Sequence, residues 1–93
     1  MTENIQFRFI RKWALRGALV PYSIFINGQW VGYLKNGREL EVAVPRNSGY
    51  LIEEQAPFGS CVWLNSGESH VEIEVRTVGG WKECCYPVFI RKN

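Results

Sequence analysis

Two Asn-Gly dipeptides, Asn27-Gly28 and Asn36-Gly37, constrain the fold of this chain more than any other feature. Both central residues of a type I′ turn need positive φ, which Gly adopts freely and Asn tolerates, so each dipeptide predicts a two-residue β-hairpin. Asn65-Ser66-Gly67 and Gly79-Gly80 supply two further turn signals in the second half of the chain. Turns at this frequency leave no room for long helices and indicate an all-β protein.

Short segments in which apolar and polar residues alternate lie between the turns, as in half-buried strands. We expect strands at residues 5–13, 20–26, 29–35, 38–44, 50–55, 60–64, 69–77 and 82–90, and at most one helical turn at 14–19. A chain of 93 residues accommodates one hydrophobic core rather than two. We therefore expect a single domain over residues 1–93, a two-sheet antiparallel sandwich of about 7–8 strands built from hairpins and meanders.

The two Asn-Gly turns predict which side chains of the first half share a face. The first turn sets Phe25 opposite Trp30. Together the two turns place eight side chains on the other face, which we expect to be core: Tyr22, Ile24, Ile26, Val31, Tyr33, Leu40, Val42 and Val44. Glu39 and Glu41 fall on the face of Phe25 and Trp30, so that face is expected to meet water.

The second half predicts a similar three-stranded meander. The Ser66-Gly67 turn would set Trp63 opposite His70 on the outer face, and the Gly79-Gly80 turn would leave Phe89 on that face near His70. Each meander has one apolar face, and packing these faces together would produce the sandwich.

Charge and hydropathy exclude several classes of partner. The formal net charge is +2, from eleven Lys and Arg against nine acidic residues, all of them Glu. This balance is too mild to indicate nucleic-acid binding, and we expect the basic residues near the chain ends to form a solvated face, with a polyanion site as the alternative. No signal-peptide pattern is seen, and the longest apolar run is far shorter than the roughly 18 residues of a membrane-spanning helix. We expect no membrane association.

The three cysteines favour a reducing, cytoplasmic location, because their number is odd and their spacing does not repeat. Cys84 and Cys85 are adjacent, so in a strand they would point to opposite faces and could not share one metal ion. Cys61 and Cys85 would lie about 9–10 Å apart, too far for a disulfide. We expect three free thiols, no metal and no cofactor.

The segment from Ile24 to Leu34, with the sequence IFINGQWVGYL, resembles a pattern of small bacterial β-sandwich domains of the PEGA-like kind. Those domains show alternating apolar residues, then Asp or Asn with Gly, then a Val-Gly-x-Leu run. Gly49-Tyr50-Leu51 is similar to the Gly that precedes their next strand, and the resemblance covers roughly residues 21–78. The Pro-Glu-Gly-Ala stretch that names the family is missing. The resemblance implies a non-enzymatic binding or surface module.

One combination of residues could carry catalysis. The predicted registers place Cys61 beside Glu72 on an outer face, with His70 two residues from Glu72 and about 7–8 Å from Cys61 on the diagonal. Nucleophilic catalysis needs these groups within hydrogen-bond reach, and a flat sheet face offers neither a pocket nor oxyanion donors. We expect no enzyme, and a minor enzymatic role of Cys61, His70 and Glu72 is the third alternative.

The aromatic side chains on the predicted outer faces are the strongest functional signal. Phe25 and Trp30 share one such face, and Trp63 and His70 share another. Exposed apolar patches often mark contact surfaces, and aromatic residues dominate binding hot spots. Coverage of these rings by residues 1–20 or by the C-terminal tail is the structural alternative.

We therefore expect a non-enzymatic binding or assembly module. Its contact residues would be Phe25, Trp30, Trp63 and His70. The partner would be another protein or a second copy of the chain. A carbohydrate-binding module that uses the same rings as stacking platforms is the alternative function.

Overall fold

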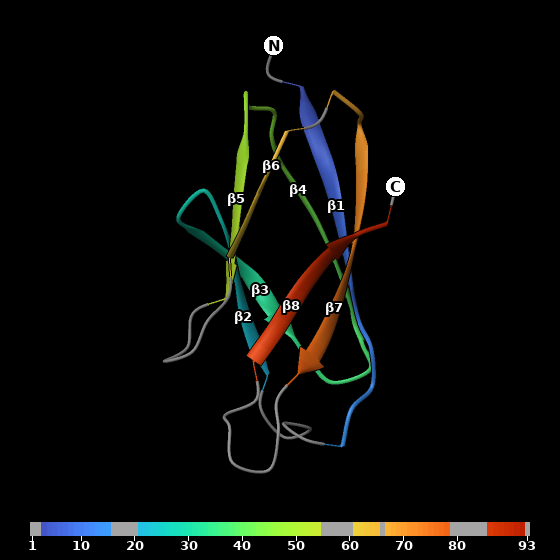
Figure 1. Cartoon of the computed structure of the whole chain (residues 1–93). Helices are drawn as coiled ribbons and strands as arrows, with labels where there is room; N and C mark the ends of the chain where they lie inside the picture. Colours follow the sequence, from blue (N-terminus) through green and yellow to red (C-terminus); the bar gives the residue numbers. More distant parts are fainter. Residues whose placement is uncertain (1–2, 16–20, 55–60, 66, 79–85, 93) are drawn as a thin grey trace.

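The computed structural model describes residues 3–15, 21–54, 61–65, 67–78 and 86–92, and these residues form an all-β sandwich (Figure 1). Its strands are β1 (Asn4–Arg11), β2 (Tyr22–Ile26), β3 (Gln29–Leu34), β4 (Glu39–Pro45), β5 (Tyr50–Glu54), β6 (Cys61–Leu64), β7 (His70–Val78) and β8 (Tyr86–Arg91). Sheet A has the strand order β4-β1-β7-β8, and sheet B has the order β3-β2-β5-β6. Every one of the eight strands expected from the alternating pattern is confirmed. Within the described ranges there is no helix of the length and hydropathy that a bilayer crossing needs.

Sheet A is mixed rather than purely antiparallel, which corrects the sequence-based prediction. β1 lies between β4 and β7, and it pairs antiparallel with β4 but parallel with β7. This central position gives the backbone of β1 hydrogen-bonding partners on both sides. Its alternating side chains Ile5, Phe7 and Phe9 are fully buried. Pairing between strands so distant in the chain cannot be read from local turn signals.

The first Asn-Gly turn forms as predicted, but the hairpin behind it contains a bulge. Asn27 and Gly28 have φ values of 51° and 82°, and Phe25 lies opposite Trp30. The register then shifts between Ile24 and Phe25, so that Ile24 pairs with Gly32 instead of Val31. A bulge inserts one extra residue into a strand and moves the residues beyond it to the opposite face.

The bulge reverses two side chains relative to the prediction. Tyr33, expected in the core, is 58% exposed, whereas Leu34 is fully buried. Gly32 has a φ of 155°, and a Cβ there would lie 3.0 Å from a methyl group of Leu40. The bulge therefore depends on a glycine at this position.

The second Asn-Gly dipeptide does not form a hairpin, and the predicted pairing of β3 with β4 is wrong. The Arg38 N–H donates to the Lys35 carbonyl at 3.0 Å, and only Gly37 of the two central residues has positive φ. The Asn36 side chain instead forms hydrogen bonds with the backbone of Ala14, in the segment that follows β1. Its amide donates to the Ala14 carbonyl at 3.0 Å and accepts from the Ala14 N–H at 2.9 Å. The turn thus carries the chain from sheet B to sheet A.

The second meander is also rearranged. β6 pairs with β5 in sheet B, while β7 pairs with β1 and β8 in sheet A, so the predicted β6–β7 hairpin is wrong. β7 and β8 are antiparallel as expected, but Val75 lies opposite Phe89 and not opposite Cys84. Because this register differs by an odd number of residues, Phe89 packs against the core instead of facing outward. Ser66, Gly79-Gly80 and the Cys84-Cys85 pair lie outside the described residues.

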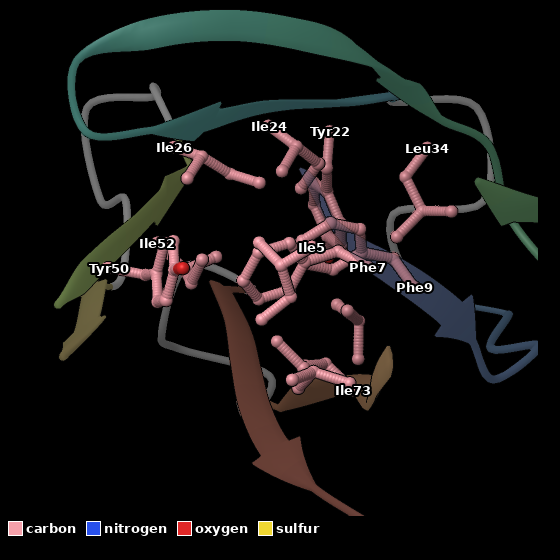
Figure 2. Packing of buried hydrophobic residues seen from close by; sticks show 12 residues of the cluster. Ile5, Phe7, Phe9, Tyr22, Ile24, Ile26, Leu34, Tyr50, Ile52 and Ile73 are labelled. Atoms are coloured by element: carbon pink, nitrogen blue, oxygen red, sulfur yellow. The ribbon is translucent and has the colours of Figure 1, made fainter. Parts of the chain in front are cut away.

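The core lies between the two sheets. Figure 2 shows Tyr22, Ile24 and Leu34 of one layer facing Phe7, Phe9 and Ile73 of the other. The remaining fully or nearly fully buried hydrophobic residues are Ile5, Ile26, Tyr50, Ile52, Val71 and Val75. Leu40, Val42 and Val44 pack against this core from β4, as predicted, although they do so from sheet A.

Candidate functional site

The outer face of sheet B, which we term the aromatic face, carries three of the four exposed aromatic side chains among the described residues; the fourth, Trp13, follows β1. Alternation with buried neighbours points eight side chains outward from its four strands: Ser23, Phe25, Trp30, Tyr33, Leu51, Glu53, Cys61 and Trp63. Trp30 is 53% exposed, Tyr33 58% and Trp63 61%, and Phe25 is half-buried among them. The described terminal strands, β1 and β8, both belong to sheet A.

Trp30 and Tyr33 form a direct aromatic pair on β3. Their ring centroids lie 5.2 Å apart, and the ring planes meet at 67° in an edge-to-face arrangement. This geometry matches the quadrupole preference of aromatic rings. The pair therefore presents a ridged surface and not a flat platform.

Trp63, at the opposite edge of the sheet, lies over a glycine. Its strand partner is Leu51, and its indole occupies the space where a side chain at Gly49 would lie, since a Cβ there would come within 2.2 Å of the ring. The glycine before β5 thus makes room for the indole.

Glu53 is the charged member of the aromatic face. It lies between Phe25 on β2 and Cys61 on β6 in the sheet registers. Antiparallel neighbours stand about 5 Å apart, so the Glu53 side chain stands beside Phe25, whereas the indole of Trp63 leans away from Glu53 and over Gly49. Neither an ion pair nor a hydrogen bond engages its carboxylate in the described structure.

The outer face of sheet A, which we term the charged face, has a different chemistry. At one end Arg8 reaches three carboxylates, donating to Glu39 at 2.7 Å and lying 3.7 Å from both Glu41 and Glu72. The hydrogen bond to Glu39, followed by the negative charge around it, raises the pKa of Arg8. A single arginine thus neutralises part of an acidic cluster.

The other end of the charged face has the reverse arrangement. Three cations surround the nearly buried carboxylate of Glu74: Arg76 is hydrogen-bonded to it, and Lys12 and Lys92 lie 3.7 Å away. The hydrogen bond from Arg76 is the main cause that lowers the pKa of Glu74, against an opposing effect of burial. Basic residues from both ends of the described chain meet here, and each lies beside a carboxylate.

The predicted site residues do not all come together. Phe25, Trp30 and Trp63 share the aromatic face, whereas His70 lies on the charged face, opposite Gln6 of β1. The predicted Trp63–His70 pair is therefore wrong, because β6 and β7 belong to different sheets.

The catalytic combination of Cys61, His70 and Glu72 is not formed. Cys61 points outward from sheet B, while His70 and Glu72 point outward from sheet A, so they lie on opposite sides of the sandwich. Within the described residues no group of three or more His, Cys, Asp or Glu side chains could hold a metal ion.

Tyr33, Leu51 and Glu53 belong to the aromatic face but were not predicted there. Tyr33 was assigned to the core because an unbulged hairpin would turn it inward. The signal that could have found it is Val31-Gly32, since an isolated glycine in a strand often marks a bulge.

Two further features of the sandwich lie apart from its outer faces. Arg11 is buried between the sheets, where its guanidinium lies 3.9 Å from the centroid of the Tyr22 ring and donates to the Leu34 carbonyl at 2.8 Å. Desolvation lowers the pKa of Arg11 and raises that of buried Glu54, and mutual attraction opposes both shifts. Tyr22 and Thr77 hydroxyls share a 2.6 Å hydrogen bond at this end of the sandwich. These contacts link the two sheets.

A small hollow of about 200 Å³ lies beside the β2–β3 turn, lined by Asn27, Gln29, Val44 and Asn47 among others. Ligand pockets usually measure about 300–1,000 Å³. The hollow is therefore too small to compete with the aromatic face as a site.

No protein-family model matches the chain, and no curated protein or solved structure matches it either. The functional argument therefore rests on the side chains themselves.

Proposed function

We propose that this chain is a non-enzymatic binding module that docks a protein partner through the aromatic face. The observation that carries the proposal is the exposure of Trp30, Tyr33 and Trp63, each more than half exposed on one face of one sheet. Trp and Tyr are the residue types most enriched in binding hot spots. On the charged face, by comparison, the charged side chains are largely satisfied within the chain.

The exposed ring area indicates an interface of moderate size. An aromatic side chain buries about 150–250 Å², so three rings that are roughly half exposed offer about 300 Å² of apolar surface. Covering that surface would contribute about 7 kcal/mol, while association costs about 4–15 kcal/mol in lost freedom. A partner must therefore extend over the neighbouring Phe25 and Leu51 as well.

The alternatives have less support. Stacking of successive sugar rings favours aromatic planes that lie side by side, whereas Trp30 and Tyr33 meet edge to face at 67°. The enzymatic alternative requires Cys61, His70 and Glu72 to lie within hydrogen-bond reach. Cys61 lies on the opposite side of the sandwich from the other two, so this requirement is not met.

A photo-crosslinking experiment tests the proposal. The full chain carries benzoylphenylalanine at Tyr33 on the aromatic face or, as a control, at Glu41 on the charged face, and adducts formed in the expressing cells are identified by mass spectrometry. We expect a defined protein adduct from the Tyr33 position and none from Glu41. Addition of Trp63→Ser should abolish the adduct, whereas Trp13→Ser, which removes a 68% exposed tryptophan beside Gly37, should not.

The opposite result would contradict the proposal. Equal adducts from both positions, or none from the Tyr33 position, would show that the aromatic face does not dock a partner. An adduct between two copies of the chain would identify self-association as the function of this face.

A further inference from the structure

Glu53 sets a chemical requirement on whatever covers the aromatic face. Among the eight outward side chains of that face it is the single charged one. Its carboxylate has no ion pair and no hydrogen bond in the described structure, whereas Glu39, Glu41, Glu72 and Glu74 on the charged face each lie within 4 Å of a cation. Among the described residues, Glu53 is thus a carboxylate without a counter-charge on a face that has no other charged side chain.

Docking of a purely apolar partner would remove water from this carboxylate. Burying an ionised carboxylate without a compensating partner is strongly unfavourable, and it would offset the gain from covering the rings. A partner that supplies a cation opposite Glu53 would avoid this cost and add a charge-assisted hydrogen bond.

The ring beside Glu53 favours a particular cation. Phe25 lies directly opposite Glu53 on the neighbouring strand, so its ring is the aromatic surface beside the carboxylate. A guanidinium is planar, stacks on aromatic faces and binds a carboxylate through two parallel hydrogen bonds, which a lysine ammonium cannot do. One arginine could therefore contact Glu53 and an adjacent ring together.

A second copy of the chain fits this requirement poorly. In a two-fold dimer formed through the centre of the aromatic face, Glu53 of one copy would approach Glu53 of the other, and like charges at close range disfavour association. The charge of the face thus favours a different partner.

From these contacts we propose that the aromatic face recognises an arginine-bearing apolar segment of another protein, with the guanidinium opposite Glu53 and beside Phe25. This inference rests on the proposed docking function and names the chemistry of the partner.

Matched peptides test the inference on the full chain. The probes are acetyl-LRFRL-amide and acetyl-LQFQL-amide, in which two arginines of the first peptide are replaced by glutamines in the second. Binding is followed by two-dimensional NMR of the ¹⁵N-labelled protein. We expect the arginine peptide to shift the indole N–H resonances of Trp30 and Trp63, with an affinity about 10-fold higher than that of the glutamine peptide.

Two charge-removing variants locate the effect. Glu53→Gln should reduce the preference for the arginine peptide to less than about 2-fold. Glu41→Gln, which removes an exposed carboxylate from the charged face, should leave the preference unchanged. Glu53→Gln keeps the size of the side chain, and the dispersion of its NMR spectrum verifies that the variant is folded.

The remaining outcomes separate the inference from the function on which it rests. Equal binding of both peptides to the aromatic face, unaffected by Glu53→Gln, would overturn the arginine requirement and leave docking intact. Failure of both peptides to shift the two indoles at about 5 mM would also overturn the inference. The docking function itself is decided by the crosslinking at Tyr33.

Discussion

The two outer faces of the sandwich differ in whether their side chains find partners within the chain. On the charged face, Arg8 and Glu74 each lie at the centre of a group of opposite charges. On the aromatic face, three rings are more than half exposed and Glu53 has no counter-charge in the described structure. Both faces belong to four-stranded sheets of the same core, so the difference lies in the outward side chains alone.

The comparison separates a face whose charges are paired within the chain from a face with exposed aromatic rings. Rows of paired charges on a sheet retain water and oppose edge and face association. Exposed aromatic rings have the opposite tendency, since their burial is favourable. The proposed docking function therefore uses the aromatic face.

The largest effect is expected from Arg11, a charge that is buried between the sheets and lies on neither outer face. Arg11→Met removes the guanidinium that stacks on Tyr22 and leaves Glu54 buried between the sheets. The change removes the hydrogen bond to the Leu34 carbonyl, the contact with the Tyr22 ring and the attraction that offsets the burial of Glu54, so we expect a loss of about 3 kcal/mol in the free energy of unfolding, measured in urea. Adding Glu54→Gln should recover part of this loss.

If Arg11→Met lowers the free energy of unfolding no more than the loss of a surface charge does, then buried and solvated charges do not differ in their contribution to stability. The matched surface variant is Arg8→Gln. Because Arg8 is solvated on the charged face, its loss should have a much smaller effect that diminishes further in high salt.

The bulge offers a way to sharpen the comparison, because it decides that Tyr33 belongs to the aromatic face. Gly32→Val places a branched side chain at a φ of 155° and against the methyl groups of Leu40. We expect a loss of about 2 kcal/mol in unfolding free energy and a weaker Trp30–Tyr33 ring contact, seen as a change in near-ultraviolet circular dichroism. Gly67→Ala is the control, since a Cβ at Gly67 meets nothing within 4 Å. A neutral Gly32→Val would show that the bulge can relax without cost.

Acid should reduce the stability that the ionised carboxylates of the charged face contribute, whereas the aromatic rings carry no group that titrates in this range. The pKa of Glu74 is lowered from its usual 4.5 in the folded protein, so its ionised form adds stability above pH 4.5 that is lost as pH falls through the folded value. Glu74→Gln should therefore flatten the fall in the urea midpoint between about pH 5 and pH 3. Glu54→Gln should act above pH 4.5 instead and remove a gain in stability as pH falls toward that value, because the pKa of Glu54 is raised and its protonation favours the folded state. An unchanged acid limb in both variants would contradict these assignments.

Local chemistry explains the successes and the errors of the sequence-based prediction. The Asn27-Gly28 turn and the Phe25–Trp30 pair formed as expected, because a type I′ turn determines the residues beside it. The prediction for Tyr33 failed only three residues beyond Trp30, where a single bulged residue reversed the face. At Asn36 the side chain binds the Ala14 backbone, a partner 22 positions away in the chain that no local pattern reveals.

The sequence alone determined the strands, the core periodicity and the outward exposure of Trp30 and Trp63, since alternation with period two depends only on neighbouring residues. The tertiary structure decided which strands pair: it inserted β1 between β4 and β7, separated Trp63 from His70, and brought Trp63 into the same sheet as Phe25, Trp30 and Glu53. The physical reason is that backbone hydrogen bonds can join any two extended segments, so the choice among partners depends on how the whole core packs.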